Sequence, residues 1–133
     1  MYKLFFITIV TSIVLLVVPA CKKNNKPPDQ VEEQLRISTN ASALNYATGP
    51  STDFNLTVES VMPQLGVKIE FVVMGESDNF QHYVGPPIET TNKNTRIFIN
   101  NLPKQKICIC AITVTSKSKP SNIAVTSFRV VFK

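Results

Sequence analysis

The sequence predicts an all-β domain over residues 34–133, a sandwich of two antiparallel sheets with about seven strands. Three observations predict this fold. From Gln34 onward, apolar and polar residues alternate with a period of two, as in strands that bury one face. Clusters of Gly, Pro, Asn and Ser interrupt the alternation about every 8–12 residues. No stretch of this region keeps a helical period.

The strands are expected at regular intervals along the chain. Alternation is cleanest at residues 54–58, where Phe54, Leu56 and Val58 share one face. Residues 106–115 are apolar on both faces, which predicts a central strand. In residues 123–132 the alternation changes phase, which predicts a β-bulge. Further strands are expected around Leu35 and Ile37 and at residues 67–73, 80–84 and 95–99.

Length and composition bound the rest of the chain. The 133 residues, 44% of them hydrophobic and 17% charged, suffice for one domain with a core and argue against wholesale disorder. Lys104 and Lys106 precede the long central strand, and Lys117 and Lys119 follow it, so these pairs are expected about 36 Å apart. They form no single basic patch, and we expect no nucleic-acid partner.

One segment resembles a known family. Residues 97–103 (Ile-Phe-Ile-Asn-Asn-Leu-Pro) and the alternating run 108–114 resemble the E–F corner and F strand of fibronectin type III domains. In this resemblance Cys108 stands where those domains carry a corner Tyr. It implies an immunoglobulin-like sandwich, either a true type III module or a generic relative.

The N-terminal residues 1–20 predict an export signal. Lys3 provides a basic start, and residues 4–18 are uncharged and rich in aliphatic residues, a run too short for a typical membrane-spanning helix. The following Val18-Pro19-Ala20-Cys21 resembles the lipobox of bacterial lipoproteins. That resemblance implies cleavage after Ala20 and lipid attachment, diacylglyceryl and palmitate, at Cys21. An ordinary secretory signal is the alternative.

Residues 21–33 are expected to form the lipidated Cys and a flexible tether. Twelve mainly polar or Pro residues follow Cys21, too few apolar side chains to form a core. The start of this segment, Cys-Lys-Lys-Asn-Asn, resembles the tethers of Bacteroidetes envelope lipoproteins. Lys22 is not the Asp that signals inner-membrane retention in proteobacterial lipoproteins. The resemblance implies anchoring to the outer membrane, with surface or periplasmic exposure left open.

Candidate reactive groups are few. Cys108 and Cys110 are two residues apart on one expected strand, too distant for a mutual disulfide, and are expected to be buried and unreactive toward a maleimide. With a single His, His82, the sequence predicts no metal site and no cofactor. No nucleophile motif, carboxylate cluster or phosphate-binding loop is present, so no enzyme is expected.

Phe80, His82 and Tyr83 are the candidate ligand contacts, because exposed rings near a sheet edge can stack on a sugar. Packing of these rings onto the sheet is the alternative. The sequence therefore predicts a non-catalytic, lipid-anchored binding or adhesion module for a glycan or an envelope protein. The second hypothesis is a periplasm-facing inhibitor or assembly factor that inserts a loop such as residues 85–87 or 118–121 into its partner.

Overall fold

A computed structural model describes residues 31–133 of the chain. The expected export signal, the lipidation site Cys21 and most of the tether lie outside these described residues. Residues 31–133 form one compact unit of nine strands without a helix, which confirms the all-β prediction. The strands are β1 (Ile37–Thr39), β2 (Leu44–Ala47), β3 (Thr52–Val58), β4 (Val67–Gly75), β5 (Gln81–Val84), β6 (Ile88–Thr90), β7 (Asn94–Ile99), β8 (Ile107–Ser116) and β9 (Ile123–Phe132).

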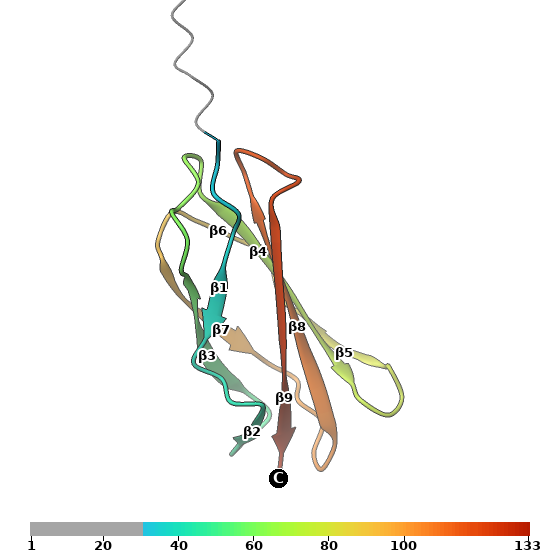
Figure 1. Ribbon diagram of the computed structural model, residues 1–133. Helices are drawn as coiled ribbons and strands as arrows, with labels where there is room; N and C mark the ends of the chain where they lie inside the picture. Colours follow the sequence, from blue (N-terminus) through green and yellow to red (C-terminus); the bar gives the residue numbers. More distant parts are fainter. Residues whose placement is uncertain (1–30) are drawn as a thin grey trace, which may run out of the picture. The chain divides into compact units, whose positions relative to one another are not determined.

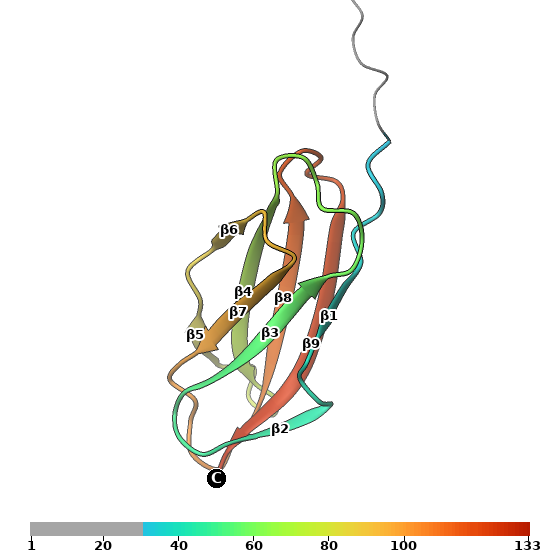
Figure 2. The same cartoon turned by 90° about the vertical axis from the view of Figure 1, so that its left-hand side faces the viewer.

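The strands form two packed sheets, an immunoglobulin-like sandwich (Figures 1 and 2). The smaller sheet has the order β1-β3-β7, and the larger sheet has the order β2-β9-β8-β4-β5, with β6 also paired to β4. Neighbouring strands run antiparallel, except that β2 lies parallel to β9. Each sheet buries alternate residues against the other sheet, as the period-two pattern predicted.

The core lies between the two sheets. Long strand β8 contributes every second residue to it, Cys108, Cys110, Ile112 and Val114, and all four are almost fully buried. The smaller sheet faces them with the apolar side chains of β3 and β7, and Phe54 meets Phe128 of β9 edge-on at 4.8 Å between ring centroids. Burial of these side chains is the main stabilising contribution, about 1.5–3 kcal/mol for each large one.

Two short strands that the sequence did not predict account for the difference between seven and nine. The first strand breaks after Thr39, and β2 then crosses to the larger sheet to pair with β9. The edge strand is interrupted at Gly85-Pro86-Pro87, because proline has no N–H to donate to the neighbouring strand. The two parts are β5 and β6, and both pair with the same side of β4. Gly85 is required there because the Phe71 ring occupies the position that a Cβ would take, at 1.9 Å.

The β-bulge expected within residues 123–132 is wrong. The pairing of β8 with β9 runs from Ile107 opposite Val131 to Thr115 opposite Ile123 without a shift in register. A register shift lies instead between β4 and β5, at Val73 and Met74, where His82 is the extra residue. The phase change in β9 therefore has another cause: its first half carries apolar residues on the face that points away from the core.

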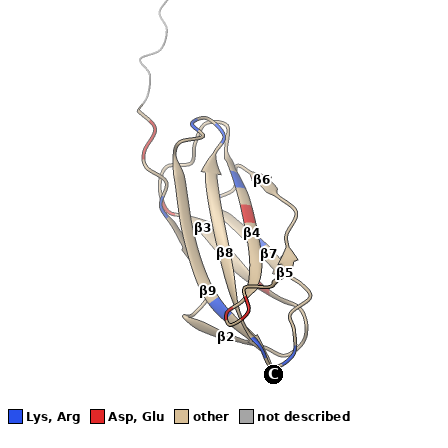
Figure 3. Cartoon of the chain, turned by 90° about the vertical axis from the view of Figure 1, so that its right-hand side faces the viewer, with Lys and Arg blue, Asp and Glu red and all other residues tan. Residues whose placement is uncertain are grey.

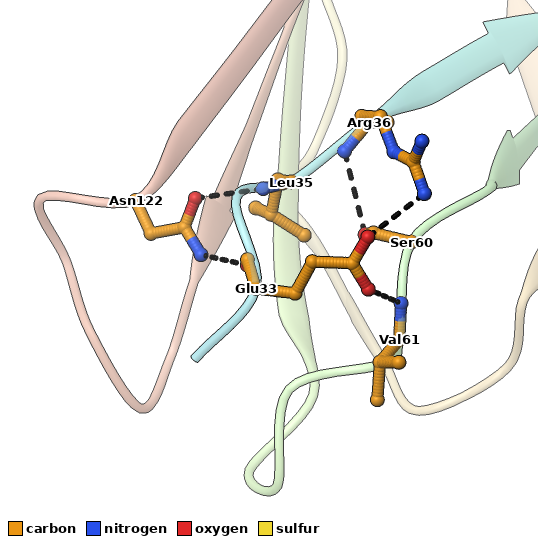
Figure 4. A network of polar contacts seen from close by, with 6 residues as sticks. All are labelled: Glu33, Leu35, Arg36, Ser60, Val61 and Asn122. Carbon is orange, nitrogen blue, oxygen red and sulfur yellow. Dashed lines mark hydrogen bonds and ion pairs between the residues drawn. The ribbon is translucent and has the colours of Figure 1, made fainter. Parts of the chain in front are cut away.

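A polar network fixes the start of the described chain to one end of the sandwich (Figure 4). The Asn122 side chain accepts a hydrogen bond from the Leu35 N–H and donates one to the Glu33 carbonyl, both at 2.8 Å. The Glu33 carboxylate accepts from the Val61 N–H at 2.9 Å and pairs with Arg36 at 2.8 Å. Asn122 is only 3% exposed, so its two bonds satisfy polar groups that are shielded from water, whereas the bonds of the Glu33 carboxylate are exposed. The chain thus enters the domain beside the β3–β4 and β8–β9 connections.

Candidate functional site

The outward face of the larger sheet carries exposed apolar side chains from β5, β8 and β9 and half-buried ones from β4. Val125 of β9 is 71% exposed, Val84 of β5 is 56% exposed, and Ile107 and Ile123 are each more than 40% exposed. The half-buried apolar residues Val72, Met74, Ile109 and Val131 lie among Val84 and Ile107, whereas Thr113, Thr115 and Ser127 lie between them and Val125 and Ile123. We call these eight apolar residues, together with Ala111, the apolar face.

Strand register explains how these side chains are arranged. One row on the outward side consists of strand partners from β5, β4, β8 and β9, in that order: Val84, Val72, Ala111 and Ser127. The next row contains Met74, Ile109 and Arg129, and the row beyond it contains Ile107 and Val131. With strands about 4.8 Å apart and rows about 6.7 Å apart, each residue occupies about 32 Å² of the sheet surface, so the nine residues of the apolar face cover roughly 290 Å². Apolar patches of a few hundred Å² occur on soluble monomers and often coincide with binding sites.

The few charges on this side of the sheet are paired within the chain. On β4, Lys68 and Glu70 form an ion pair at 2.7 Å in the rows of Ile123 and Val125, and Arg129, in the row of Met74 and Ile109, pairs with Glu76 at 2.5 Å. Figure 3 shows β8 without a coloured position, β4 with one blue and one red position in its upper half, and β9 with one blue position in its lower part. The face is therefore locally close to neutral, although the whole chain has a formal charge of +5.

Sequence reasoning missed this face although the signal was present. The apolar residues Ile123 and Val125 stand out of phase with Phe128 and Val130 in the sequence, and this was interpreted as a bulge. The apolar character of both sides of β8 predicted a central strand, and β8 does lie between β9 and β4, with one of its two sides covered in residues 31–133. Alternation within one strand shows which of its residues share a face. The register between strands decides which residues of different strands lie next to each other, and alternation alone does not give that register.

The three candidate ligand contacts do not form one exposed platform. Phe80 is exposed and lies just before β5, with its ring edge-on to His82 at 5.0 Å between ring centroids. Tyr83 is half-buried on the inner side, where its ring lies 6.0 Å from that of Phe71. Only Phe80 of the three presents an open ring, so stacking of a sugar on several rings has little support here.

The turn before β5 is held by Asp78. Its carboxylate accepts from the Phe80 N–H and from the Lys106 ammonium group, both at 3.0 Å, and these donors lower the pKa of Asp78. Gly75 leaves the space for this arrangement, because a Cβ at that position would lie 2.0 Å from the Asp78 carboxylate and 3.3 Å from His82 Nε2. That His82 nitrogen is buried and has no hydrogen-bond partner among the described residues.

Cys108 and Cys110 are free thiols on the inner side of β8, as expected, and both are buried. Burial raises the pKa of the Cys110 thiol to about 12. The pKa of Cys108 is also raised, first by burial and second by the Asp78 carboxylate. Thiolate is the reactive form, so both residues are suited to packing and poorly suited to nucleophilic chemistry.

The described part of the chain offers no group of three or more His, Cys, Asp or Glu side chains that could hold a metal ion. The hollow between β2 and β3, lined in part by Asn40, Tyr46 and Phe128, measures about 190 Å³. Small-molecule sites usually measure about 300–1,000 Å³. The apolar face is therefore a better candidate site than this hollow. Within residues 31–133 no helix is long and apolar enough to span a bilayer.

The chain matches no protein-family model, and it matches no curated protein. The fold and the apolar face are therefore the observations on which a function can be argued.

Proposed function

We propose that this chain is a non-catalytic, lipid-anchored binding module of the bacterial outer membrane, and that it binds a protein through the apolar face. The apolar face is the single observation that carries the proposal. Leaving Val84 and Val125 in water forgoes about 25 cal/mol for each Å² of apolar surface that a partner would cover. A set of such residues on neighbouring strands therefore favours association with another surface.

The chemistry of the face favours a protein over a glycan. Sugar sites need hydrogen-bonding groups placed around aromatic rings, whereas this face presents mainly aliphatic side chains and small hydroxyl residues such as Ser127. Its aromatic neighbour, Tyr46 of β2, is opposite Val131 at the margin and carries the Lys133 ammonium group 3.9 Å from its ring centre. Apolar residues together with Met74 and Arg129 fit the composition of protein–protein interfaces, in which Met and Arg are enriched.

The anchoring part of the proposal rests on the lipobox-like residues 18–21 and on the way in which the chain enters the domain. The bonds between Asn122, Glu33 and Leu35 fix the tether to one end of the sandwich. The apolar face extends along the strands from that end, on the side of the sandwich. A partner in the same membrane could therefore contact it alongside the domain.

The inhibitor hypothesis has less support. The Gly85-Pro86-Pro87 break is held against the sheet, since the Gly85 N–H donates to the Phe71 carbonyl at 3.1 Å and the Phe71 ring covers Gly85. The turn at residues 118–121 is closed by the Ser116 hydroxyl, which accepts from the N–H groups of Ser118 and Lys119. Neither segment is an extended loop ready to enter an active site.

Site-specific photo-crosslinking in cells of the source bacterium tests the binding function. A benzophenone amino acid is placed at Ser127 in the central row of the face, and the matched control places it at Asn55 on the outward face of the smaller sheet. We expect protein adducts from Ser127 and none from Asn55. Absence of any adduct at Ser127 would refute the proposed use of the face.

The anchor is tested separately. The Cys21→Ser variant should lose incorporation of radiolabelled palmitate and should leave the membrane fraction. A Cys21→Ser chain that remains membrane-bound would contradict lipid anchoring and would leave the binding result intact.

A further inference from the structure

We infer that the end of the sandwich at which the chain enters the domain docks on the phospholipid surface of the anchoring membrane, with anionic headgroups as its ligand. This inference rests on the proposed function, because it takes Cys21 as the lipid anchor. The docking surface consists of three connections: residues 59–66 between β3 and β4, residues 91–93 between β6 and β7, and residues 117–122 between β8 and β9. We call these three connections the tether end.

The three connections of the tether end lie side by side. The Leu65 N–H of the first connection donates to the Ser118 hydroxyl of the third at 2.9 Å. One open hollow is lined by residues of all three connections, among them Leu65, Asn92 and Lys117. The tether end is therefore one surface, and a bilayer that touches one connection can touch the others.

The length of chain before the described residues limits which part of the domain can reach the membrane. Ten residues lead from Cys21 to Val31, and they span at most about 35 Å. The Glu33 carboxylate accepts from the Val61 N–H at 2.9 Å, so the chain joins the domain at the tether end (Figure 4). The opposite end lies about 30 Å away along β8, so it could touch the bilayer only with those ten residues almost fully extended. The tether end is the part of the domain with the easiest access to the bilayer.

Exposed aliphatic side chains give the tether end an affinity for a bilayer. Val61 is 68% exposed and Leu65 is 61% exposed, and both lie in the β3–β4 connection. Neither side chain belongs to the core or to the apolar face. Apolar side chains that enter the boundary between headgroups and acyl chains leave water, which favours docking.

Lysines give the tether end its preference for anionic headgroups. Its three connections contain Lys93, Lys117 and Lys119 and a single acid, Glu59. Lys117 pairs with Glu89, whereas Lys93 and Lys119 have no ion-pair partner among residues 31–133. Basic side chains close to an anionic membrane are attracted to its surface. The ammonium groups of Lys93 and Lys119 are thus available to lipid phosphates.

The acids near the tether end are held by donors of the same chain. Glu33 pairs with Arg36 at 2.8 Å, the Glu32 carboxylate accepts from the Asn122 amide at 2.7 Å, and the Glu59 carboxylate accepts from a Ser hydroxyl of β1. These acids offset part of the positive charge. Docking therefore depends on the two aliphatic side chains together with the two lysines, and we expect it to respond to changes in either.

The test uses the full lipidated chain, purified in detergent and reconstituted into vesicles of phosphatidylethanolamine and phosphatidylglycerol. Leu65→Cys carries an environment-sensitive nitrobenzoxadiazole dye, and a nitroxide lipid in the vesicles quenches the dye on contact. The matched control places the dye at Ser51→Cys, an exposed position between β2 and β3 at the opposite end. Native Cys108 and Cys110 are buried and do not compete for the dye. We expect quenching and a blue-shifted emission at position 65, and neither at position 51.

A second set of variants tests the chemistry of the contact. Lys93→Gln with Lys119→Gln, introduced into the dye-labelled Leu65→Cys chain, should lower the ratio of docked to free domain at least about tenfold, because both unpaired lysines are lost. Vesicles without phosphatidylglycerol should have the same effect. The matched control removes two lysines from the opposite end, Lys104→Gln with Lys106→Gln, and should change the ratio by less than about twofold.

The outcomes separate this inference from the proposed function. A purified chain without palmitate would overturn the anchor and the docking together. A palmitoylated chain whose dye at position 65 stays in water would overturn the docking alone. Equal quenching at positions 65 and 51, or quenching of a dye at Ser127→Cys on the outward face of the larger sheet, would also overturn it, because the domain would then tumble or lie on its side. Docking that persists without both lysines and without phosphatidylglycerol would overturn the anionic headgroup as the ligand.

Discussion

The outward faces of the two sheets differ, although both follow the same alternation. On the smaller sheet that face carries Asp53 and Arg96 as an ion pair at 2.7 Å, and Thr57 bonded to Asn94 at 2.9 Å. Its exposed ring, Phe98, lies under the Arg96 guanidinium. On the larger sheet the outward face carries nine apolar residues beside Lys68, Glu70, Arg129 and three hydroxyl residues. Folding requires only that the inner residues be apolar, so the packing of the two sheets does not account for the apolar residues of this outer face.

The largest expected effect is on the free energy of unfolding, and it should differ between the inner and the outer side of the larger sheet. Ile112→Ala should lower the free energy of unfolding by about 2–5 kcal/mol, because it opens a cavity in a fully packed core. Val125→Thr, on the outer side, should change it by no more than about 0.5 kcal/mol. Urea unfolding at low protein concentration measures both. An equally large loss for Val125→Thr would mean that the apolar face stabilises the fold itself.

The next effect concerns the polar network that joins the two sheets at the tether end. Asn122→Ala should cost about 1–3 kcal/mol, because the Leu35 N–H and the Glu33 carbonyl lose their partner in a site shielded from water. Hydrogen exchange should show loss of protection at the Leu35 amide. Asn55→Ala, at an exposed position of the smaller sheet, is the control and should leave this amide protected.

The smallest effect is expected on the polar outer face. The Arg96 guanidinium lowers the pKa of Asp53 through their hydrogen bond, so the pair stabilises the folded state above the unfolded pKa of about 4. This contribution is lost as the pH falls below that value. The difference in unfolding midpoint between the parent and Asp53→Asn should therefore be small at pH 7 and vanish near pH 2. A difference that persists at pH 2 would show that Asp53 acts through packing.

The sequence predicted the sandwich well, since period-two alternation reports directly on burial of one face. It did not predict β2 or β6. Their sequences, Leu-Asn-Tyr-Ala and Ile-Glu-Thr, are short and mixed in polarity, and they become strands only because β9 and β4 offer free edges for pairing. Tertiary context decides such segments.

The candidate site was harder to predict than the fold. The sequence predicted ligand contacts at Phe80, His82 and Tyr83 because exposed rings near a sheet edge can bind a ligand. In the structure Tyr83 lies half-buried on the inner side of the sheet. His82 is the extra residue at the register shift and interrupts the alternation of β5. The apolar face was visible in the sequence only as a departure from alternation at Ile123 and Val125. Its extent depends on β5, β4, β8 and β9 lying side by side in register, which is a long-range property.

The break at Pro86 and Pro87 has a consequence for aggregation. A sheet with long open edges can add further copies edge to edge, strand upon strand, into a growing fibre. The edge of the larger sheet is divided there into two short segments, and the two prolines offer no N–H to a neighbouring strand. The opposite edge is the four-residue β2. Growth through the edges is thus disfavoured.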